Sequence, residues 1–265
     1  MNRDFIAKHW YASVYEQFEN QTYDVEFLLN VIKEQTDNTP QNILEVACGG
    51  GRICVPLAQA GHTVTGFDSD MHMLLRCYHR MQGLNNIRCY MAEATTTEWG
   101  KDYDIVVMAG NILINIESDM EYADAQATFI KNAAAALHPG GHLYMDFDLL
   151  FDPVPCFNRL KESNYFDGTD DLGTSGRTVS YGSVYDPVTQ ICAGTSHWEL
   201  TTNNGEQIIR SDRFYKYIPT QAQVYGWLRE AGFTIDRTYM NYTYDPVPEP
   251  IVESTYRAIV WARKN

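Results

Sequence analysis

The sequence predicts an α/β fold: a doubly wound, mixed sheet of seven strands, with helices on both faces and an antiparallel β meander inserted between strands five and six. Three observations predict it. Short apolar runs alternate with helical segments between residues 43 and 146, a rhythm typical of βαβ units and a mostly parallel sheet. Long Thr- and Tyr-rich segments then replace this rhythm up to residue 217. A helical segment and two more strand-like segments follow.

The first forty residues are predicted to be helical, because apolar residues recur at helical spacing between residues 27 and 32 and breakers follow at 36–40. The next strand, 43–46, is short, apolar and followed by three glycines. Strands of the predicted core cover residues 43–46, 62–67, 87–91, 104–109 and 142–146, and the helices between them cover 52–60, 70–81 and about 125–137.

The inserted meander is predicted from three segments, 179–185, 191–201 and 207–217. Asp186-Pro187 and Asn203-Asn204-Gly205 separate them, and Asn-Gly is a strong hairpin signal. A helix over 220–231, with Gly232 past its end, and a final strand pair over 234–241 and 254–262 complete the sheet.

Composition excludes several classes of protein. The chain has 265 residues, a length that suits one large domain or one domain with a sizeable insertion. Of these residues 45% are hydrophobic and 13% aromatic, too many for a disordered chain. The formal net charge is -14 and Lys and Arg do not cluster, which disfavours nucleic-acid binding. No run of about 18 apolar residues predicts a membrane span, and the first ten residues lack the apolar core of a signal peptide.

The cysteines indicate a reducing compartment. No Cys-x-x-Cys pair occurs, so neither a zinc site nor a disulfide framework is expected, and no metal is predicted. We therefore expect a cytoplasmic protein, with an exported protein carrying free thiols as the alternative. The six cysteines are Cys48, Cys54, Cys77, Cys89, Cys156 and Cys192.

The most informative segment is Glu45-Val46-Ala47-Cys48-Gly49-Gly50-Gly51-Arg52. A strand that runs into glycines and then a helix lets the backbone approach a ligand and presents helix N–H groups to it. A dinucleotide site with Gly-x-Gly-x-x-Gly is the alternative. Gly49 and Gly51 fit its first two positions, but Cys54 occupies the third, where close helix–strand packing favours glycine.

This segment resembles the first motif of class I S-adenosylmethionine-dependent methyltransferases, acidic-x-Gly-x-Gly-x-Gly, with Ala47 in the first glycine position. Four further matches follow in order: Gly66-Phe67-Asp68, Ala92-Glu93-Ala94, Tyr103 to Val107, and Leu137-His138-Pro139-Gly140-Gly141. The resemblance covers roughly residues 40–150 and implies a Rossmann-like fold with S-adenosylmethionine as cofactor. The cofactor-binding residues that it implies are Tyr11, Glu45, Ala47, Cys48, Gly49, Gly51, Arg52, Asp68, Ser69, Met73, Glu93, Ala94, Ala109, Gly110 and Asn111.

In the family, the acidic residue that ends the second strand binds both ribose hydroxyls, a role that falls to Asp68. A carboxylate there accepts two charge-assisted hydrogen bonds from the diol and would repel a 2′-phosphate. The other reading of Asp68 is a helix N-cap. Glu93, with Glu98 and Asp102 as alternatives, corresponds to the residue that reads the adenine edge.

Other assignments have alternatives as well. Arg52 reaches either the cofactor carboxylate or the neighbouring helix. Cys48 is a small buried residue rather than a reactive thiol, and Met71 and Met73 are either core residues or an adenine platform. Tyr11 and Tyr15 belong either to a lid like that of similar enzymes or to a plain packing helix.

The pattern divides the chain into residues 1–40, 41–150, 151–217 and 218–265. With the resemblance, we expect these to be an N-terminal helical lid, the cofactor-binding core, a substrate cap and the segment that completes the core. Ligands of such sheets bind at the carboxyl ends of the strands, so Asp146 and Asp148, at the end of strand five, are candidate catalytic residues. Tyr15 and His197 are the others. The alternatives are a surface carboxylate for each Asp and, for His197, the exposed face of a sheet.

The predicted function is transfer of a methyl group to an O, N or C nucleophile of a small molecule by in-line displacement. The expected partner is that small-molecule acceptor, with no nucleic acid and no membrane, for a monomer or homodimer. A nicotinamide-dependent oxidoreductase and a non-catalytic cofactor-binding module are the alternatives.

Overall fold

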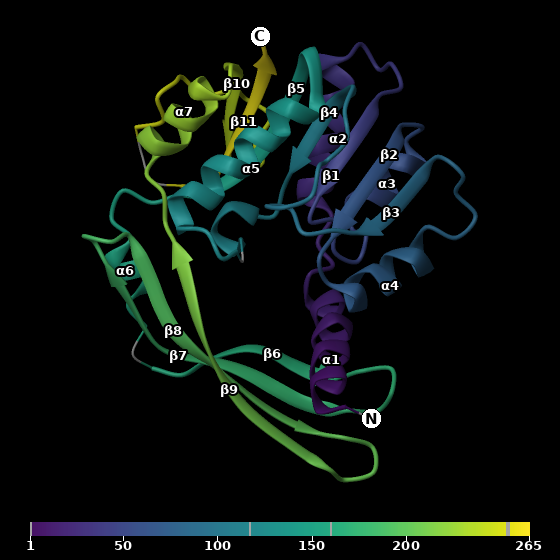
Figure 1. Cartoon of the computed structure of the whole chain (residues 1–265), viewed down its shortest axis with the longest axis vertical. Helices are drawn as coiled ribbons and strands as arrows, with labels where there is room; N and C mark the ends of the chain where they lie inside the picture. The colour runs from purple at the N-terminus through teal and green to yellow at the C-terminus, as the bar shows by residue number, and fades with distance from the viewer. Residues whose placement is uncertain (1, 117, 160, 253–254) are drawn as a thin grey trace. The chain divides into compact units, whose positions relative to one another are not determined.

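The computed structural model describes residues 2–116, 118–159, 161–252 and 255–265. The chain divides into two compact units, each with its own sheet (Figure 1). The larger unit combines Thr22–Phe151 with Pro219–Asn265, and the smaller unit combines Met1–Gln21 with Asp152–Ile218.

The larger unit contains the predicted seven-stranded mixed sheet. Its strands are β1 (Asn42–Val46), β2 (Thr63–Asp68), β3 (Ile87–Met91), β4 (Tyr103–Met108), β5 (Leu137–Leu149), β10 (Phe233–Met240) and β11 (Thr255–Lys264). Their order is β10-β11-β5-β4-β1-β2-β3, and β11 is antiparallel to both of its neighbours while the other pairs are parallel. The first five strands therefore end at one edge of the sheet, together with the start of β11.

The two faces of this sheet carry separate cores because side chains alternate along each strand. In β1, Leu44 and Val46 pack against α5 and α7, whereas Ile43 packs on the opposite side with α2, α3 and α4. Figure 1 shows α5 and α7 together over one face of the sheet. These helices are α2 (Tyr23–Gln35), α3 (Cys54–Gln59), α4 (Met71–Arg80), α5 (Tyr122–Ala136) and α7 (Gln221–Glu230), and a short 3-10 helix, η1, spans Ile112–Asn115.

The smaller unit is a four-stranded antiparallel sheet with one long helix packed on it. Its elements are α1 (Arg3–Phe18), α6 (Val154–Phe157), β6 (Ser163–Thr169), β7 (Ser175–Asp186), β8 (Ile191–Thr201) and β9 (Gln207–Tyr217), and the strands follow one another in chain order. Ile6, Trp10 and Val14 of α1 are buried against Phe166 and Leu200 of the sheet. The Trp10 indole N–H also donates to the Gly168 carbonyl at 3.1 Å.

The fold class is confirmed, but the boundaries differ from the predicted ones in three places. The helical segment 1–40 is divided, since α1 lies in the smaller unit and α2 in the larger one. The meander has four strands rather than three, because β6 was not predicted. The Pro-Gly-Gly turn lies within β5, which pairs with β4 through Leu137 and again, after a register shift, through His142. Residue 254 of the predicted last strand lies outside the described residues.

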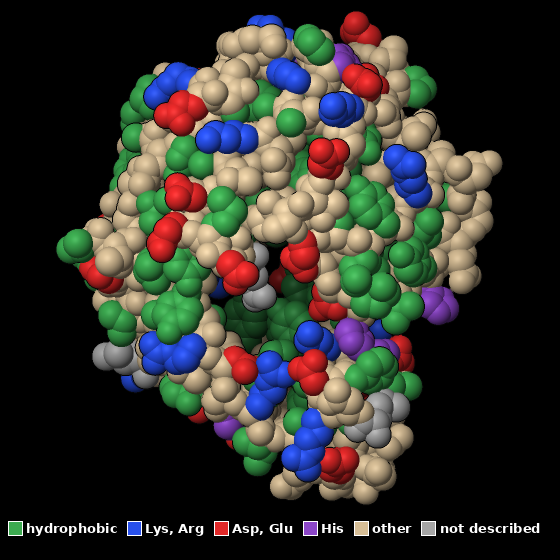
Figure 2. Space-filling model, viewed as in Figure 1, with side chains coloured by type: hydrophobic (Ala, Val, Ile, Leu, Met, Phe, Trp, Pro, Cys, Tyr) green, Lys and Arg blue, Asp and Glu red, His purple; other side chains and the backbone are tan. Residues whose placement is uncertain are grey.

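Charged side chains of both signs are interspersed over the face shown in Figure 2, in keeping with a chain that has 34 acidic and 20 basic residues. None of the helices in the described ranges is long and apolar enough to cross a membrane.

Candidate active site

The loop between β1 and α3 has the geometry of a ligand cradle. Ala47, Gly49 and Gly51 all have positive φ angles, 56°, 51° and 83°. A Cβ on Gly49 would meet no atom within 4 Å, so this part of the loop faces open space. A Cβ on Gly51 would lie 2.9 Å from the Cys77 sulfur, so this glycine is required by packing as well as by φ.

Asp68 ends β2 and holds the loop in place. Its Oδ2 accepts a hydrogen bond from the Gly49 N–H at 2.8 Å, and its Oδ1 accepts one from the Asp70 N–H at 2.8 Å. The helix N-cap is Asp70, which accepts from the His72 N–H at 2.7 Å. Burial raises the pKa of Asp68, and its backbone donors oppose that shift.

Glu45 lies in β1 with its carboxyl group buried. Its Oε2 has no hydrogen-bond partner among the described residues. Burial raises the pKa of Glu45 to about 8. An unpaired buried carboxyl oxygen is costly in a folded protein, and it suits a ligand that brings a donor or a positive charge.

Asp146 lies in the buried second half of β5 and organises the loop that follows β4. Its Oδ1 accepts from the Asn111 N–H at 2.6 Å, and its Oδ2 accepts from the Gly110 N–H at 3.0 Å. The side chain is 1% exposed, and burial raises its pKa. This placement favours a positioning role, and direct contact of Asp146 with a substrate stays a prediction.

Two residues beside Asp146 were not predicted. The Tyr242 hydroxyl donates to Asp146 Oδ2 at 3.2 Å, and Arg257 Nε lies 3.8 Å from Asp146 Oδ1. Arg257 also pairs with Asp148, whose N–H donates to the Asn111 side chain at 3.1 Å. The start of β11 lies at the carboxyl end of β5 because the two strands are antiparallel, and that topology is the signal that would have placed Arg257 here.

Arg52 forms a two-pronged ion pair with Asp24 of α2. Its Nη1 and Nη2 each donate to one carboxylate oxygen of Asp24 at 2.7 Å. This fork-to-fork geometry is the strongest form of the Arg–carboxylate pair. Of the two readings of Arg52, contact with the neighbouring helical segment is the one that these bonds favour, while contact with a cofactor stays a prediction.

The remaining predicted cofactor residues of the larger unit lie along the same edge of the sheet, in the segments that follow β1 to β4. Met73 is buried and Met71 is 42% exposed. Ser69 and Glu93 are exposed. The Ala94 carbonyl accepts from Trp99 and Asn132. Cys48 is buried and Ala109 is half-buried.

Tyr11, Tyr15 and His197 lie in the smaller unit. Tyr11 and Tyr15 both pack edge-on against Phe166. Their ring centroids lie 5.4 Å and 5.8 Å, respectively, from that of Phe166, so both contribute to the core between α1 and the sheet. His197 Nδ1 lies 2.8 Å from the Ser211 hydroxyl. A cofactor-binding role for Tyr11 and catalytic roles for Tyr15 and His197 stay predictions.

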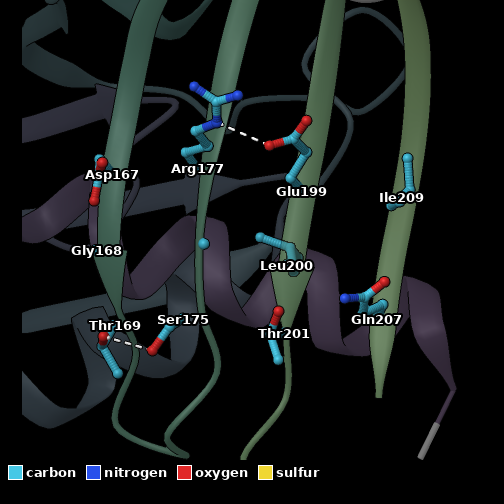
Figure 3. A pocket seen from close by; sticks show the side chains of 11 residues that line it. Asp167, Gly168, Thr169, Ser175, Arg177, Glu199, Leu200, Thr201, Gln207 and Ile209 are labelled. Atoms are coloured by element: carbon cyan, nitrogen blue, oxygen red, sulfur yellow. Dashed lines mark hydrogen bonds and ion pairs between the residues drawn. The ribbon is translucent and has the colours of Figure 1, made fainter. Parts of the chain in front are cut away.

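The sheet of the smaller unit has a shallow hollow of about 540 Å³. Figure 3 shows Arg177 and Glu199, paired at 2.9 Å, on neighbouring strands that line it, with α1 passing behind the strands. The pair is well exposed, with side chains 41% and 44% accessible. Such a surface offers polar contacts but no enclosed pocket.

Part of the chain resembles a known domain family. Residues 43–141 match the model of the methyltransferase domain family. A ubiquinone biosynthesis O-methyltransferase from Coxiella burnetii is 29% identical over 119 residues, which are 44% of this chain and 47% of the relative. The chain therefore matches about half the length of this curated relative.

Solved structures match nearly the whole chain. An S-adenosylmethionine-dependent methyltransferase from Clostridium acetobutylicum superposes with a TM-score of 0.72 at 13% identity, covering 96% of each chain. The sugar N-methyltransferase KedS8 from Streptoalloteichus superposes with a TM-score of 0.70 at 16% identity, covering 95% of this chain and 93% of that one. Identities this low establish the fold alone. Residues 43–141 thus resemble a methyltransferase domain, in a chain that has the fold of class I S-adenosylmethionine-dependent methyltransferases.

Proposed function

We propose that this protein binds S-adenosylmethionine in the loops that follow β1, β2 and β4, at the carboxyl ends of these strands. It would transfer the cofactor's methyl group to a small molecule. The observation that carries the proposal is the hydrogen bond between Asp68 and the glycine loop. A carboxylate at the end of β2 lies within 2.8 Å of Gly49 N, beside a loop whose backbone is open at Gly49.

The residues present fit this cofactor. Asp68 uses two of its lone-pair positions on backbone N–H groups and has acceptor capacity left for a ribose diol. Glu45 hydrogen-bonds Cys54 and keeps one buried oxygen, Oε2, without a partner among the described residues, which could accept a hydrogen bond from the cofactor's ammonium group. S-adenosylmethionine carries no phosphate, so its binding needs no phosphate cradle in this loop.

When bound, the cofactor supplies a methyl group activated by its sulfonium centre. The chain itself has to hold the nucleophile and the donor in line and exclude water, because orientation supplies much of the acceleration for such a transfer. The loop after β4 is suited to this task, since Asp146 fixes the backbone of Gly110 and Asn111 through two hydrogen bonds. Asp148, Tyr15 and His197 remain candidates for removing a proton from the acceptor.

The acceptor is proposed to be a small molecule. One observation supports this: the likeness to the sugar N-methyltransferase covers nearly the whole chain, including the smaller unit. The net charge of -14 favours a neutral or cationic acceptor over a polyanion such as a nucleic acid. We place the protein in the cytoplasm as a monomer or homodimer, in keeping with six free cysteines.

Calorimetric titration with S-adenosylhomocysteine tests the cofactor assignment, using wild type, Asp68→Asn and Asp70→Asn. The matched control is Asp70→Asn, which removes a neighbouring charge while asparagine still caps α4. We expect the Asp68 variant to bind at least about tenfold more weakly, because charge-assisted hydrogen bonds are lost, and the Asp70 variant to bind like wild type.

A parallel titration with NAD separates the enzyme classes. Binding of NAD without binding of S-adenosylhomocysteine would replace this proposal by an oxidoreductase. If S-adenosylhomocysteine binds, the protein is incubated with radiolabelled S-adenosylmethionine and a panel of amino sugars, phenols and carboxylic acids. Cofactor binding with no transfer to any small molecule would favour a non-catalytic module.

A further inference from the structure

Four cysteine side chains from four segments of the larger unit meet beside the glycine loop. Cys48 lies in that loop, Cys54 begins α3, Cys77 lies in α4 and Cys89 lies in β3. Their sulfur atoms all lie within 4.8 Å of one another. Three of the four residues are buried, and Cys89 is half-buried.

Two of the distances between these sulfurs are close to those between ligands of one metal ion, and none is that of a disulfide. Cys54 Sγ lies 3.8 Å from Cys77 Sγ and 4.0 Å from Cys89 Sγ, whereas a disulfide bond is about 2.05 Å long. A tetrahedral ion with metal–sulfur bonds of about 2.3 Å places its ligand sulfurs about 3.8 Å apart. The third measured pair, Cys77 and Cys89 at 3.2 Å, would need to open slightly.

We propose that Cys48, Cys54, Cys77 and Cys89 bind one zinc ion. Four thiolates in one coordination sphere select a soft, tetrahedral ion over calcium or magnesium, which prefer oxygen ligands. With four protein ligands the site is closed, so the zinc is structural and takes no part in the chemistry. Binding displaces the thiol protons to solvent, which leaves a four-thiolate zinc centre.

Two glycines lie so close to these sulfurs that a side chain at either position would collide with them. A Cβ on Gly66 of β2 would lie 2.9 Å from the Cys48 sulfur and 3.1 Å from the Cys89 sulfur. A Cβ on Gly51 would likewise lie 2.9 Å from the Cys77 sulfur. The ion would therefore join the glycine loop, α3, α4 and β3 at one point, and would hold that loop in its observed shape. The zinc assignment itself does not rest on the proposed methyl transfer.

The test is the metal content of the full chain, purified without a polyhistidine tag from zinc-supplemented cells and dialysed against a weak chelator. Mass spectrometry of the metals should find about one zinc per chain. The variants Cys77→Ser and Cys89→Ser should retain at least about tenfold less zinc. Cys156→Ser, in the smaller unit, is the matched control and should retain as much as wild type.

Cobalt reconstitution of the wild type keeps the proposal testable if the serine variants do not fold. Cobalt added to the metal-free chain should give the intense d–d and thiolate charge-transfer absorption of a tetrahedral sulfur site, and zinc should abolish it. Less than about a tenth of a zinc per chain, or no such cobalt spectrum, would overturn the proposal. Iron in place of zinc would overturn the choice of metal. None of these readouts needs cofactor binding, so failure here is distinguishable from failure of the proposed function.

Discussion

The carboxylate of Asp146 and the backbone N–H of Asn111 are joined by a hydrogen bond of 2.6 Å. This bond links the carboxyl end of β5 to the turn after β4, where Asn111 itself has a left-handed backbone with φ 57°. A left-handed non-glycine residue is strained and persists where its surroundings hold it. The fully buried carboxylate is thus part of what holds the edge of the sheet in a conformation suited to a ligand.

Replacing Asp146 should therefore be costly for stability. We expect Asp146→Asn to lower the free energy of unfolding by about 2 to 4 kcal/mol, because the amide nitrogen would face backbone donors in a buried site. Asp148→Asn, at a side chain that is 18% exposed, should cost about 1 kcal/mol or less. Urea unfolding measures both, and equal losses would argue against the special role of Asp146.

The pH dependence of stability should report on Asp68. Burial raises its pKa above the ordinary value of 3.8, so the folded chain holds this proton more tightly than the unfolded chain does. The corresponding stabilisation is complete below about pH 4 and is lost as the pH rises through the folded pKa. Urea unfolding at a series of pH values should show this loss in wild type relative to Asp68→Asn.

The same group predicts the pH dependence of ligand binding. An ionised Asp68 accepts hydrogen bonds from a ribose diol better than a protonated one does, so affinity for S-adenosylhomocysteine should rise with pH over that same window. Asp68→Asn should flatten the profile. A wild-type profile that the variant leaves unchanged would assign the titration to another group.

Much of this edge of the sheet could be predicted from local patterns. The first five strands and the turn at Gly49–Gly51 follow from short apolar runs and glycines, which act over a few residues of chain. Asp68 could be located because it ends one of those runs. These predictions depend on neighbours in sequence, and the fold preserves them.

The other features depend on contacts between distant segments. Arg257 reaches Asp146 across an antiparallel pair, and the four cysteines come together from separate elements with no characteristic spacing. Strand β6 was not predicted, because Asp167 and Gly168 weaken its strand pattern. Helical periodicity also does not reveal which sheet a helix covers, so the separation of α1 from α2 could not be predicted.

The ion pair between Arg52 and Asp24 offers a test of the two readings of Arg52. A double-mutant cycle with Arg52→Lys and Asp24→Asn should give a coupling energy of about 1 to 2 kcal/mol, since lysine cannot reproduce the bidentate geometry. The side chains are 25% and 11% exposed, so solvent screening is moderate. If Arg52 also binds the cofactor, Arg52→Lys should weaken S-adenosylhomocysteine binding more than Asp24→Asn does.

Packing around the cysteine sulfurs predicts opposite effects for two glycine substitutions. Gly66→Ala should destabilise the chain by about 1 to 3 kcal/mol, because the new methyl would overlap the sulfurs of Cys48 and Cys89. Gly226→Ala is the matched control. It lies within α7 with no atom within 4 Å of the added Cβ, and should stabilise by about 0.5 to 1 kcal/mol. Urea unfolding shows whether each substitution raises or lowers the free energy of unfolding. No change for Gly66→Ala would contradict the close packing.

Ala47 stands where the methyltransferase motif has a glycine, and its φ of 56° places an alanine in the left-handed region, which strains its backbone. A left-handed alanine is strained by about 1 to 2 kcal/mol, whereas glycine tolerates the conformation but loses more entropy on folding. Ala47→Gly should therefore raise the free energy of unfolding by about 0.5 to 1 kcal/mol. Ala60→Gly, at a right-handed position with φ -73°, should lower it. Thermal or urea unfolding of the two variants compares the same substitution at a left-handed and a right-handed position. A loss of stability in both would show that contacts of the Ala47 methyl group outweigh its backbone strain.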